Sequence, residues 1–143
     1  MGLPGSGKTT LARHLALKLK AVHFNADEVR SNINKDLGFS LEHRLEHARR
    51  MGWLCDQVVK ADHWALADFV CPTRATRQSF GAAFVIWMNT IREGRFEDTN
   101  RMFENPQPGE YSVCITDFDA ERHAEYIHQQ LQREILPNIF EVN

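Results

Sequence analysis

The chain has 143 residues, a formal charge of −2 and 43% hydrophobic residues. This length suits one domain with a single buried core. Acidic and basic residues nearly cancel, which excludes the overall basic character of duplex nucleic-acid-binding proteins, so we expect no nucleic-acid partner.

The cysteines and the apolar runs indicate in which cellular compartment we expect the protein. Cys55, Cys71 and Cys114 are far apart, form no C-x-x-C pair and come without a visible targeting segment. This pattern favours a reducing compartment, and we expect a cytoplasmic protein. The longest apolar run, residues 82–88, is much shorter than the ~20 residues of a membrane span, so we expect no membrane contact.

The first residues of the chain carry its most informative motif. The sequence Gly2-Leu3-Pro4-Gly5-Ser6-Gly7-Lys8-Thr9 fits G-x-x-x-x-G-K-[ST]. Glycines let backbone N–H groups turn inward around a phosphate, the lysine reaches the outer phosphates, and the hydroxyl holds Mg²⁺. An amphipathic helix over residues 10–19 follows, as the motif requires. We therefore predict ATP and Mg²⁺ as cofactors, and ATP-binding residues Pro4, Gly5, Ser6, Gly7, Lys8, Thr9 and Thr10.

A buried strand normally precedes this motif, but here only Met1 does. Three explanations stay open: the sequence starts late, the central strand comes from elsewhere, or it is absent. An open position in a sheet invites pairing with another chain. We expect either a homodimer that fills the position or weakened nucleotide affinity.

The remaining elements alternate along the chain. Apolar runs predict strands at 21–25, 63–70, 82–88 and 111–116, and periodic or capped segments predict helices at 41–60, 73–80 and 117–135, with a helix or turn from Asp27. Ser40 is the expected cap of the second long helix, and Asp117 or Asp119 that of the last. Residues 91–110 are polar and predict a mobile flap.

This alternation predicts an α/β fold of the P-loop NTPase or kinase type. We expect three layers, with a mostly parallel sheet covered by helices on both faces and its first strand apparently missing from the chain. Residues 1–143 are expected to form a single kinase-like domain with its flap at about 91–110.

The size of the chain, the flap and the lack of a guanine-reading Asn-Lys-x-Asp stretch favour a small-molecule kinase. Phosphoryl transfer needs a carboxylate near the acceptor hydroxyl, and Asp27 is the first choice because it follows a strand end. With Lys8 it is our predicted catalytic residue; its alternative role is a helix cap. Asp68 ends an apolar strand and is the second acid, either at the magnesium ion or purely structural. The predicted metal ligands are Thr9, Asp27 and Asp68.

At this point the sequence resembles the adenylyl-sulfate kinase family. The resemblance covers roughly the first 80 residues in matching order, and its most specific part is Asp36-Leu37-Gly38-Phe39-Ser40. The other matching stretches are the phosphate motif, Asp27-Glu28-Val29-Arg30, Arg44 with Arg49-Arg50, and Cys71-Pro72-Thr73-Arg74-Ala75-Thr76-Arg77.

The resemblance implies transfer of the ATP γ-phosphate to the 3′-hydroxyl of adenylyl sulfate. On this reading Asp27 lies near the acceptor hydroxyl and Mg²⁺, Arg30 and Arg44 hold the phosphosulfate, and Phe39 stacks on the adenine. The full set of implied substrate-binding residues is Arg30, Phe39, Arg44, His47, Cys71, Pro72 and Arg77.

The sequence also departs from the family pattern. Asn25 stands in place of the first aspartate of Asp-Gly-Asp, His47 in place of an asparagine that contacts substrate, and Cys71 in place of a serine. The flap lacks the family's Arg-Asp and Lys-Gly-Leu-Tyr stretch. Two alternatives therefore stay open: a kinase with another hydroxyl acceptor, and a non-catalytic nucleotide-binding protein.

One further stretch of the sequence matches the motif of a different class of protein. His43-Arg44-Leu45-Glu46-His47 matches the zinc-protease pattern H-x-x-E-H. It lies within the kinase-like helix and has no evident partner acid, so we interpret it as a polar helix face.

Overall fold

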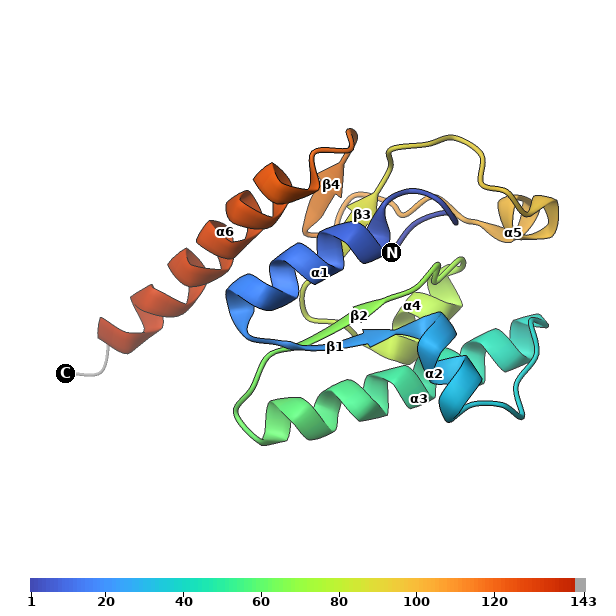
Figure 1. The fold of residues 1–143 in the computed structure, drawn as a ribbon, viewed down its shortest axis with the longest axis horizontal. Coiled ribbons are helices and arrows are strands. Elements are labelled where there is room, and N and C mark those ends of the chain that lie inside the picture. Colours follow the sequence, from blue (N-terminus) through green and yellow to red (C-terminus); the bar gives the residue numbers. More distant parts are fainter. Residues whose placement is uncertain (141–143) are drawn as a thin grey trace.

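The computed structural model describes the backbone of residues 1–140 and the side chains of residues 1–134 (Figure 1). The elements in chain order are α1 (Lys8–Leu19), β1 (Val22–Asn25), α2 (Ala26–Asn32), α3 (Leu41–Lys60), β2 (Ala65–Asp68), α4 (Arg74–Phe80), β3 (Ile86–Met88), α5 (Glu97–Met102), β4 (Val113–Ile115) and α6 (Ala120–Phe140). No helix in this part of the chain has the length and apolar character needed to cross a membrane.

All four strands lie in parallel pairs. Strand β1 pairs with β2, with Val22 opposite Ala65, and β3 pairs with β4, with Ile86 opposite Val113. The prediction of parallel strands is confirmed, and the open strand position that we expected divides the strands into two pairs. The described strands form two two-stranded sheets, because the position between β2 and β3 holds only the first residues of the chain, through one bridge from Gly2 to Met88.

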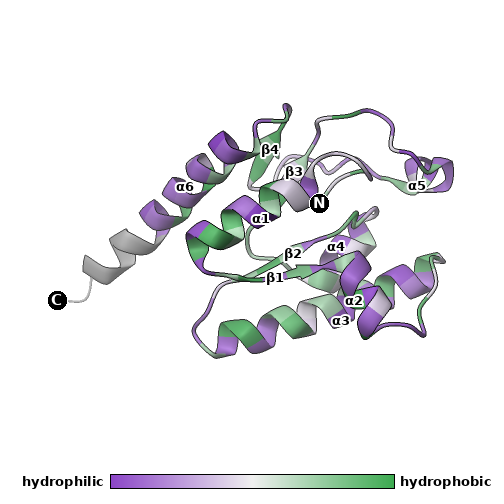
Figure 2. Cartoon of the chain, in the orientation of Figure 1, coloured by the Kyte–Doolittle hydropathy of each residue, from purple (hydrophilic) through white to green (hydrophobic). Residues whose placement is uncertain are grey.

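Helices cover both sides of the strands, as predicted. Helices α1 and α6 pack together on one side, and α3 and α4 pack together on the other (Figure 1). Helices α1 and α3 carry hydrophobic and hydrophilic residues in turn (Figure 2), as amphipathic helices do. One core cluster lies under α1 and α6 and contains Leu15 and Ile127, and a second lies under α3 around Met51.

Local capping explains where the helices begin. The Ser40 hydroxyl accepts from the N–H of His43 at the start of α3, as predicted, and Thr73 and Thr76 form a capping box at the start of α4. Of the two predicted caps of the last helix, Asp119 precedes α6 directly and accepts from the N–H of Arg122. Two of these helices, α3 and α4, place residues of their first turns, Arg44 and Thr76, at the cavity described below.

Two segments differ from their predictions. The apolar run 82–88 forms a strand only over Ile86–Met88, and the preceding residues line a cavity instead. The segment 91–110, predicted as a polar flap, contains helix α5. The side chain of Asn100 both accepts from the N–H of Gly94 and donates to its carbonyl, which ties the start of this segment to α5.

Candidate active site

The phosphate loop leads directly into α1. Gly5 and Gly7 have φ angles of 89° and 91°, a left-handed region that disfavours other residues. Gly7 is the N-cap of α1, and no side chain caps that helix. The first-turn N–H groups are therefore left for an anion, and the helix dipole favours negative charge there.

Lys8 lies over this loop. Its Nζ donates to the carbonyl of Leu3 at 2.8 Å. Burial lowers the pKa of Lys8 to about 8, against the opposing effect of the Asp68 and Asp27 carboxylates. A weakly solvated ammonium held in this way is ready to exchange a carbonyl for phosphate oxygens.

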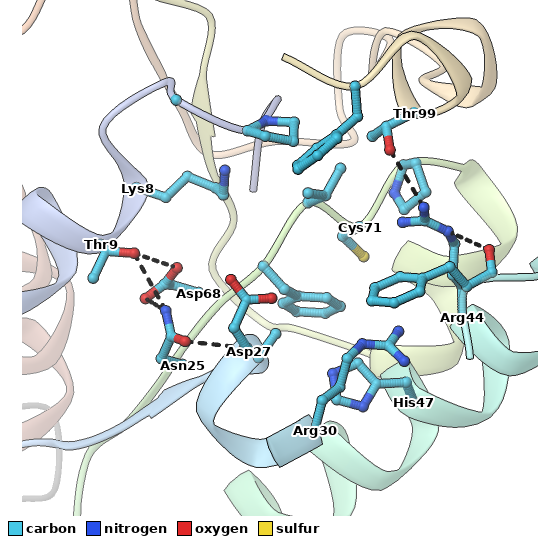
Figure 3. Close-up of a pocket in the computed structure, with 18 of the residues that line it drawn as sticks. Lys8, Thr9, Asn25, Asp27, Arg30, Arg44, His47, Asp68, Cys71 and Thr99 are labelled. Carbon is cyan, nitrogen blue, oxygen red and sulfur yellow. Dashed lines mark hydrogen bonds between the residues drawn. The ribbon is translucent and has the colours of Figure 1, made fainter. Parts of the chain in front are cut away.

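Thr9 and Asp68 meet at the base of the cavity (Figure 3). Thr9 Oγ1 donates to Asp68 Oδ1 at 3.1 Å, and Asn25 Nδ2 and His23 Nε2 lie 3.1 Å and 2.7 Å from Asp68 Oδ2. Burial raises the pKa of Asp68, but the hydrogen bonds from His23, Asn25 and Thr9 outweigh burial and hold it below its usual range. Asp68 is thus an ionised acid beside the hydroxyl of the phosphate motif.

Asp27 extends from the first turn of α2 into the same cavity, and Figure 3 shows it between Lys8 and Arg30. Its carboxylate acts electrostatically on both of these cations. The alternative role of Asp27 as a helix cap is wrong: Asn25 is the N-cap, and its Oδ1 accepts from the N–H groups of Asp27 and Glu28 at 3.1 Å. The Asp27 carboxylate therefore does not serve as the cap of α2.

Phe39 lies at the other end of the cavity with two arginines over its ring. The guanidinium carbons of Arg30 and Arg44 are 4.7 Å and 5.6 Å from the ring centroid. Arg30 also donates to the carbonyl of Gly38 at 2.7 Å, and Arg44 donates to the carbonyl of Phe39 at 2.9 Å. The ring remains 63% exposed and offers an aromatic edge bordered by positive charge.

A polar network behind Phe39 holds the loop that carries it. Arg50 forms two hydrogen bonds of 2.8 Å with Asp36 and one with Asn34. Asn34 Nδ2 lies 2.9 Å from His47 Nδ1, and both side chains are almost fully buried. Burial, with the charge of Arg30, lowers the pKa of His47 to about 4, so this imidazole is neutral at physiological pH.

One cavity of about 770 Å³ brings most of the predicted site residues together. Its lining contains Pro4, Gly5, Gly7, Lys8, Thr9, Thr10, Asp27, Arg30, Phe39, Arg44, His47, Asp68, Cys71 and Pro72. Two predicted residues are not part of it. The Ser6 side chain is buried beneath the loop, and Arg77 points elsewhere.

Arg77 lies outside this cavity and makes its contacts within the protein. Its guanidinium donates to the carbonyl of Glu104 at 3.0 Å and lies 3.8 Å from Glu110. It therefore links α4 to the end of the flap segment. Its predicted contact with substrate stays a prediction, and the direction of this side chain depends on where residues 104–110 pack.

The flap adds residues that the sequence did not single out as a site. Arg95, Phe96, Asp98 and Thr99 line the cavity, and Arg44 donates to Thr99 Oγ1 at 3.3 Å. No motif marks these four residues. The sequence marks them only as part of the polar segment 91–110, which we predicted to be a flap.

The H-x-x-E-H match does not form a zinc site. The Nδ1 atoms of His43 and His47 contact the N–H of Gly38 and the side chain of Asn34. Within residues 1–134, no group of three or more His, Cys, Asp or Glu side chains could hold a metal ion.

The site residues fit ATP and Mg²⁺. The uncapped start of α1 and the Lys8 ammonium suit the phosphates, and the adjacent oxygens of Thr9 and Asp68 are of the type that Mg²⁺ prefers.

Comparison with known proteins agrees with this geometry. A family model described as adenylylsulphate kinase matches residues 1–91. The adenylyl-sulfate kinase of Shewanella halifaxensis is 43% identical over 88 residues, which are 58% of this chain and 43% of that protein. The chain spans less than half of the length of this relative and of a similar one from Shewanella denitrificans.

Two solved structures show the fold. The structure of the Mycobacterium tuberculosis APS kinase CysC in complex with AMPPNP and APS has a TM-score of 0.74 at 22% identity, covering 92% of this chain and 94% of that chain. The hexameric APS kinase from Thiobacillus denitrificans has a TM-score of 0.71 at 27% identity, covering 94% of this chain and 28% of that one. The α/β P-loop kinase fold is thus confirmed, and with its family model matched over residues 1–91, the chain belongs to the adenylylsulphate kinase family.

Proposed function

We propose that this protein transfers the γ-phosphoryl group of ATP to the 3′-hydroxyl of adenylyl sulfate. One observation carries the proposal: a single cavity opens at one end onto Lys8 and Thr9 and at the other onto Phe39 with its two arginines. Asp27 lies between these two ends (Figure 3). The names of the curated relatives and the ligands in the Mycobacterium tuberculosis complex support the same reaction.

Each end of the cavity suits one substrate. The N–H groups at the start of α1 and the Lys8 ammonium would bind the ATP phosphates. Thr9 and Asp68 would hold Mg²⁺, which neutralises phosphate charge when bound. Arg30 and Arg44 would hold the phosphosulfate, since guanidinium forks match such oxygens, and Phe39 would contact the adenine.

Asp27 is the proposed catalytic acid–base residue. Its carboxylate extends into the cavity and is not used as a cap. It would accept the proton of the acceptor hydroxyl as the new phosphate ester bond forms and the bond between the γ-phosphorus and the β,γ-bridging oxygen breaks, releasing ADP. The charge of Lys8 on one side and Arg30 on the other would keep the two substrates in line.

We further propose that residues 1–143 act as one kinase-like domain. Its flap, residues 91–110, would close one side of the cavity. Its residues Arg95 and Thr99 at the cavity wall support this role. Cytoplasmic localisation remains a prediction, which the three free cysteines favour. The homodimer expected from the sequence is likewise a prediction, to be checked by sedimentation.

A coupled ADP-release assay tests the reaction. Turnover with MgATP and adenylyl sulfate is expected, and Lys8→Ala and Asp27→Asn should each reduce kcat at least ~100-fold. Matched controls are Lys60→Ala and Asp62→Asn, at exposed positions outside the cavity.

Two outcomes would contradict the proposal. Turnover with a different hydroxyl compound but not with adenylyl sulfate would assign another acceptor. Binding of MgATP by calorimetry without turnover on any acceptor would make the protein a nucleotide-binding homologue without catalysis.

A further inference from the structure

Thr99 of the flap lies at the wall of the active-site cavity and is only 3% exposed. It belongs to α5, beyond the residues 1–91 that the family model matches. Its hydroxyl oxygen accepts a hydrogen bond of 3.3 Å from Nη2 of Arg44 (Figure 3). Since Arg44 belongs to α3, this bond joins the flap to the end of the cavity that contains Phe39.

Two protein oxygens hold the guanidinium of Arg44. Its Nε donates to the carbonyl of Phe39 at 2.9 Å, and its Nη2 donates to the hydroxyl of Thr99. Because a guanidinium is planar, two bonds from different nitrogens fix the orientation of its plane. Within residues 1–134, Nη1 of Arg44 has no hydrogen-bond acceptor in the protein, so its N–H donors are available to a ligand.

Both of these oxygens are uncharged, which distinguishes Arg44 from its neighbour on α3. Arg50 forms salt bridges with the carboxylates of Asp36 and Glu46. Arg44 forms no salt bridge with the side chains that the structure describes, although the Asp98 carboxylate acts on it electrostatically. A carboxylate largely neutralises the cation that it binds, whereas a carbonyl or hydroxyl oxygen does not. The contacts of Arg44 therefore orient its guanidinium and leave its charge for an anion.

Helix α5 is fastened on both sides, which gives the Thr99 hydroxyl a fixed position. The Asn100 side chain forms two hydrogen bonds, of 2.8 Å and 2.9 Å, with the backbone of Gly94 ahead of the helix. After the helix, the N–H of Glu104 donates to the carbonyl of Pro72 at 2.7 Å. The flap thus presents the hydroxyl as a rigid hydrogen-bond acceptor.

We propose that Thr99 is a positioning residue of the acceptor site, which holds the Arg44 guanidinium in the orientation that binds the phosphosulfate of adenylyl sulfate. The identity of this anion rests on the proposed function, whereas the role of Thr99 rests on the hydrogen bonds around Arg44. Because Thr99 acts through Arg44, it should affect the affinity for the acceptor and not the chemical step.

Two ligands with one nucleoside test this role. Adenylyl sulfate carries the phosphosulfate and adenosine lacks it, and NMR titration gives the Kd of each. Thr99→Val keeps the branched shape and removes the acceptor oxygen, so it should weaken the binding of adenylyl sulfate about fivefold. Its Kd for adenosine should not change, which also shows that the variant is folded. Thr99→Ser retains the oxygen and should bind both ligands as the unaltered chain does.

A double-mutant cycle tests whether Thr99 acts through Arg44. Arg44→Lys keeps a positive charge but loses the Nη2 donor. In that background, adding Thr99→Val should change the Kd for adenylyl sulfate less than ~2-fold. In the coupled assay, Thr99→Val alone should raise the KM for adenylyl sulfate about fivefold and leave kcat unchanged.

Three results would overturn the inference. These are an unchanged Kd of Thr99→Val for adenylyl sulfate, an equal loss of affinity for adenosine, and an undiminished effect of Thr99→Val in the Arg44→Lys background. A selective loss of affinity for adenylyl sulfate in a chain without turnover would contradict the proposed reaction and retain the role of Thr99. An unaltered chain that does not bind adenylyl sulfate would contradict both.

Discussion

The Thr9 hydroxyl donates a hydrogen bond of 3.1 Å to the Asp68 carboxylate, although 59 residues separate them in sequence. The contact joins the first turn of α1 to the carboxyl end of β2. Because His23 and Asn25 of β1 hold the other oxygen of the same carboxylate, three elements fix its position. The oxygens proposed to hold Mg²⁺ are therefore placed by the protein itself.

The depressed pKa of Lys8 predicts a pH-dependent affinity for ATP. Its attraction for phosphate requires the protonated amine, and burial lowers the pKa of this amine to about 8. As the pH rises above 8, the Kd for MgATP should increase toward about tenfold per pH unit. Calorimetry from pH 7 to pH 10 measures this, with Lys8→Arg as the control that stays charged. An equal increase of the Kd for MgATP with pH in Lys8→Arg and in the unaltered protein would contradict the prediction.

The network around Asp68 predicts a charge-dependent contribution to stability. Because the folded pKa of Asp68 is below its usual value, the contribution is present above the unfolded pKa and is lost as the pH falls through the folded pKa. Asp68→Asn should lower the free energy of unfolding at pH 7 by about 2 kcal/mol, and the difference from the unaltered protein should shrink at pH 3 and below. Urea titrations at both pH values check this. A difference that stays constant with pH would count against an ionised, hydrogen-bonded Asp68.

The buried imidazole of His47 predicts a loss of stability in mild acid. Its pKa is lowered to about 4, so its stabilising effect is complete above the usual value of 6.5 and is lost as the pH falls toward 4. This loss amounts to about 3 kcal/mol. His47→Gln should remove this part of the pH dependence in urea titrations between pH 7 and pH 4. If the free energy of unfolding of His47→Gln falls as steeply between pH 7 and pH 4 as that of the unaltered protein, other groups cause the pH dependence.

The exposed ring of Phe39 predicts an effect on substrate binding without an effect on folding. Stacking on a base contributes ~1–3 kcal/mol, so Phe39→Ala should raise the KM for adenylyl sulfate about tenfold. The melting temperature should change little because the ring is 63% exposed. Trp53→Ala, an exposed aromatic on α3 outside the cavity, is the matched control. Equal KM values for Phe39→Ala and the unaltered enzyme would rule out the proposed adenine contact.

Features set by short-range chemistry could be predicted from the sequence. Ser40 caps α3 as expected, and the phosphate motif begins a helix that the structure places at Lys8–Leu19. Asp27 and Arg30 lie in the helix that begins after the Asn25 cap, and Phe39 directly precedes the Ser40 cap of α3, so locally set positions bring all three to one cavity. Parallel strands with helices on both sides followed from the alternation of elements.

Features set by long-range packing could not be predicted. Arg77 fits the family pattern, yet it contacts Glu104 in a segment whose path has no periodicity to reveal it. Thr99 and Phe96 enter the site for the same reason, through the position of α5. The division into two sheets was expected only as an open strand position, since the sequence does not show how far Met1 reaches between β2 and β3.

Transfer of the γ-phosphoryl group to adenylyl sulfate is tested most directly by following the label from γ-labelled ATP into separated products. With the unaltered protein, the label should appear in the 3′-phosphorylated form of adenylyl sulfate, in proportion to time and enzyme. It should be absent with Lys8→Ala. Label that remains in ATP, or passes only to water, while calorimetry shows that MgATP and adenylyl sulfate both bind, would contradict the proposed reaction.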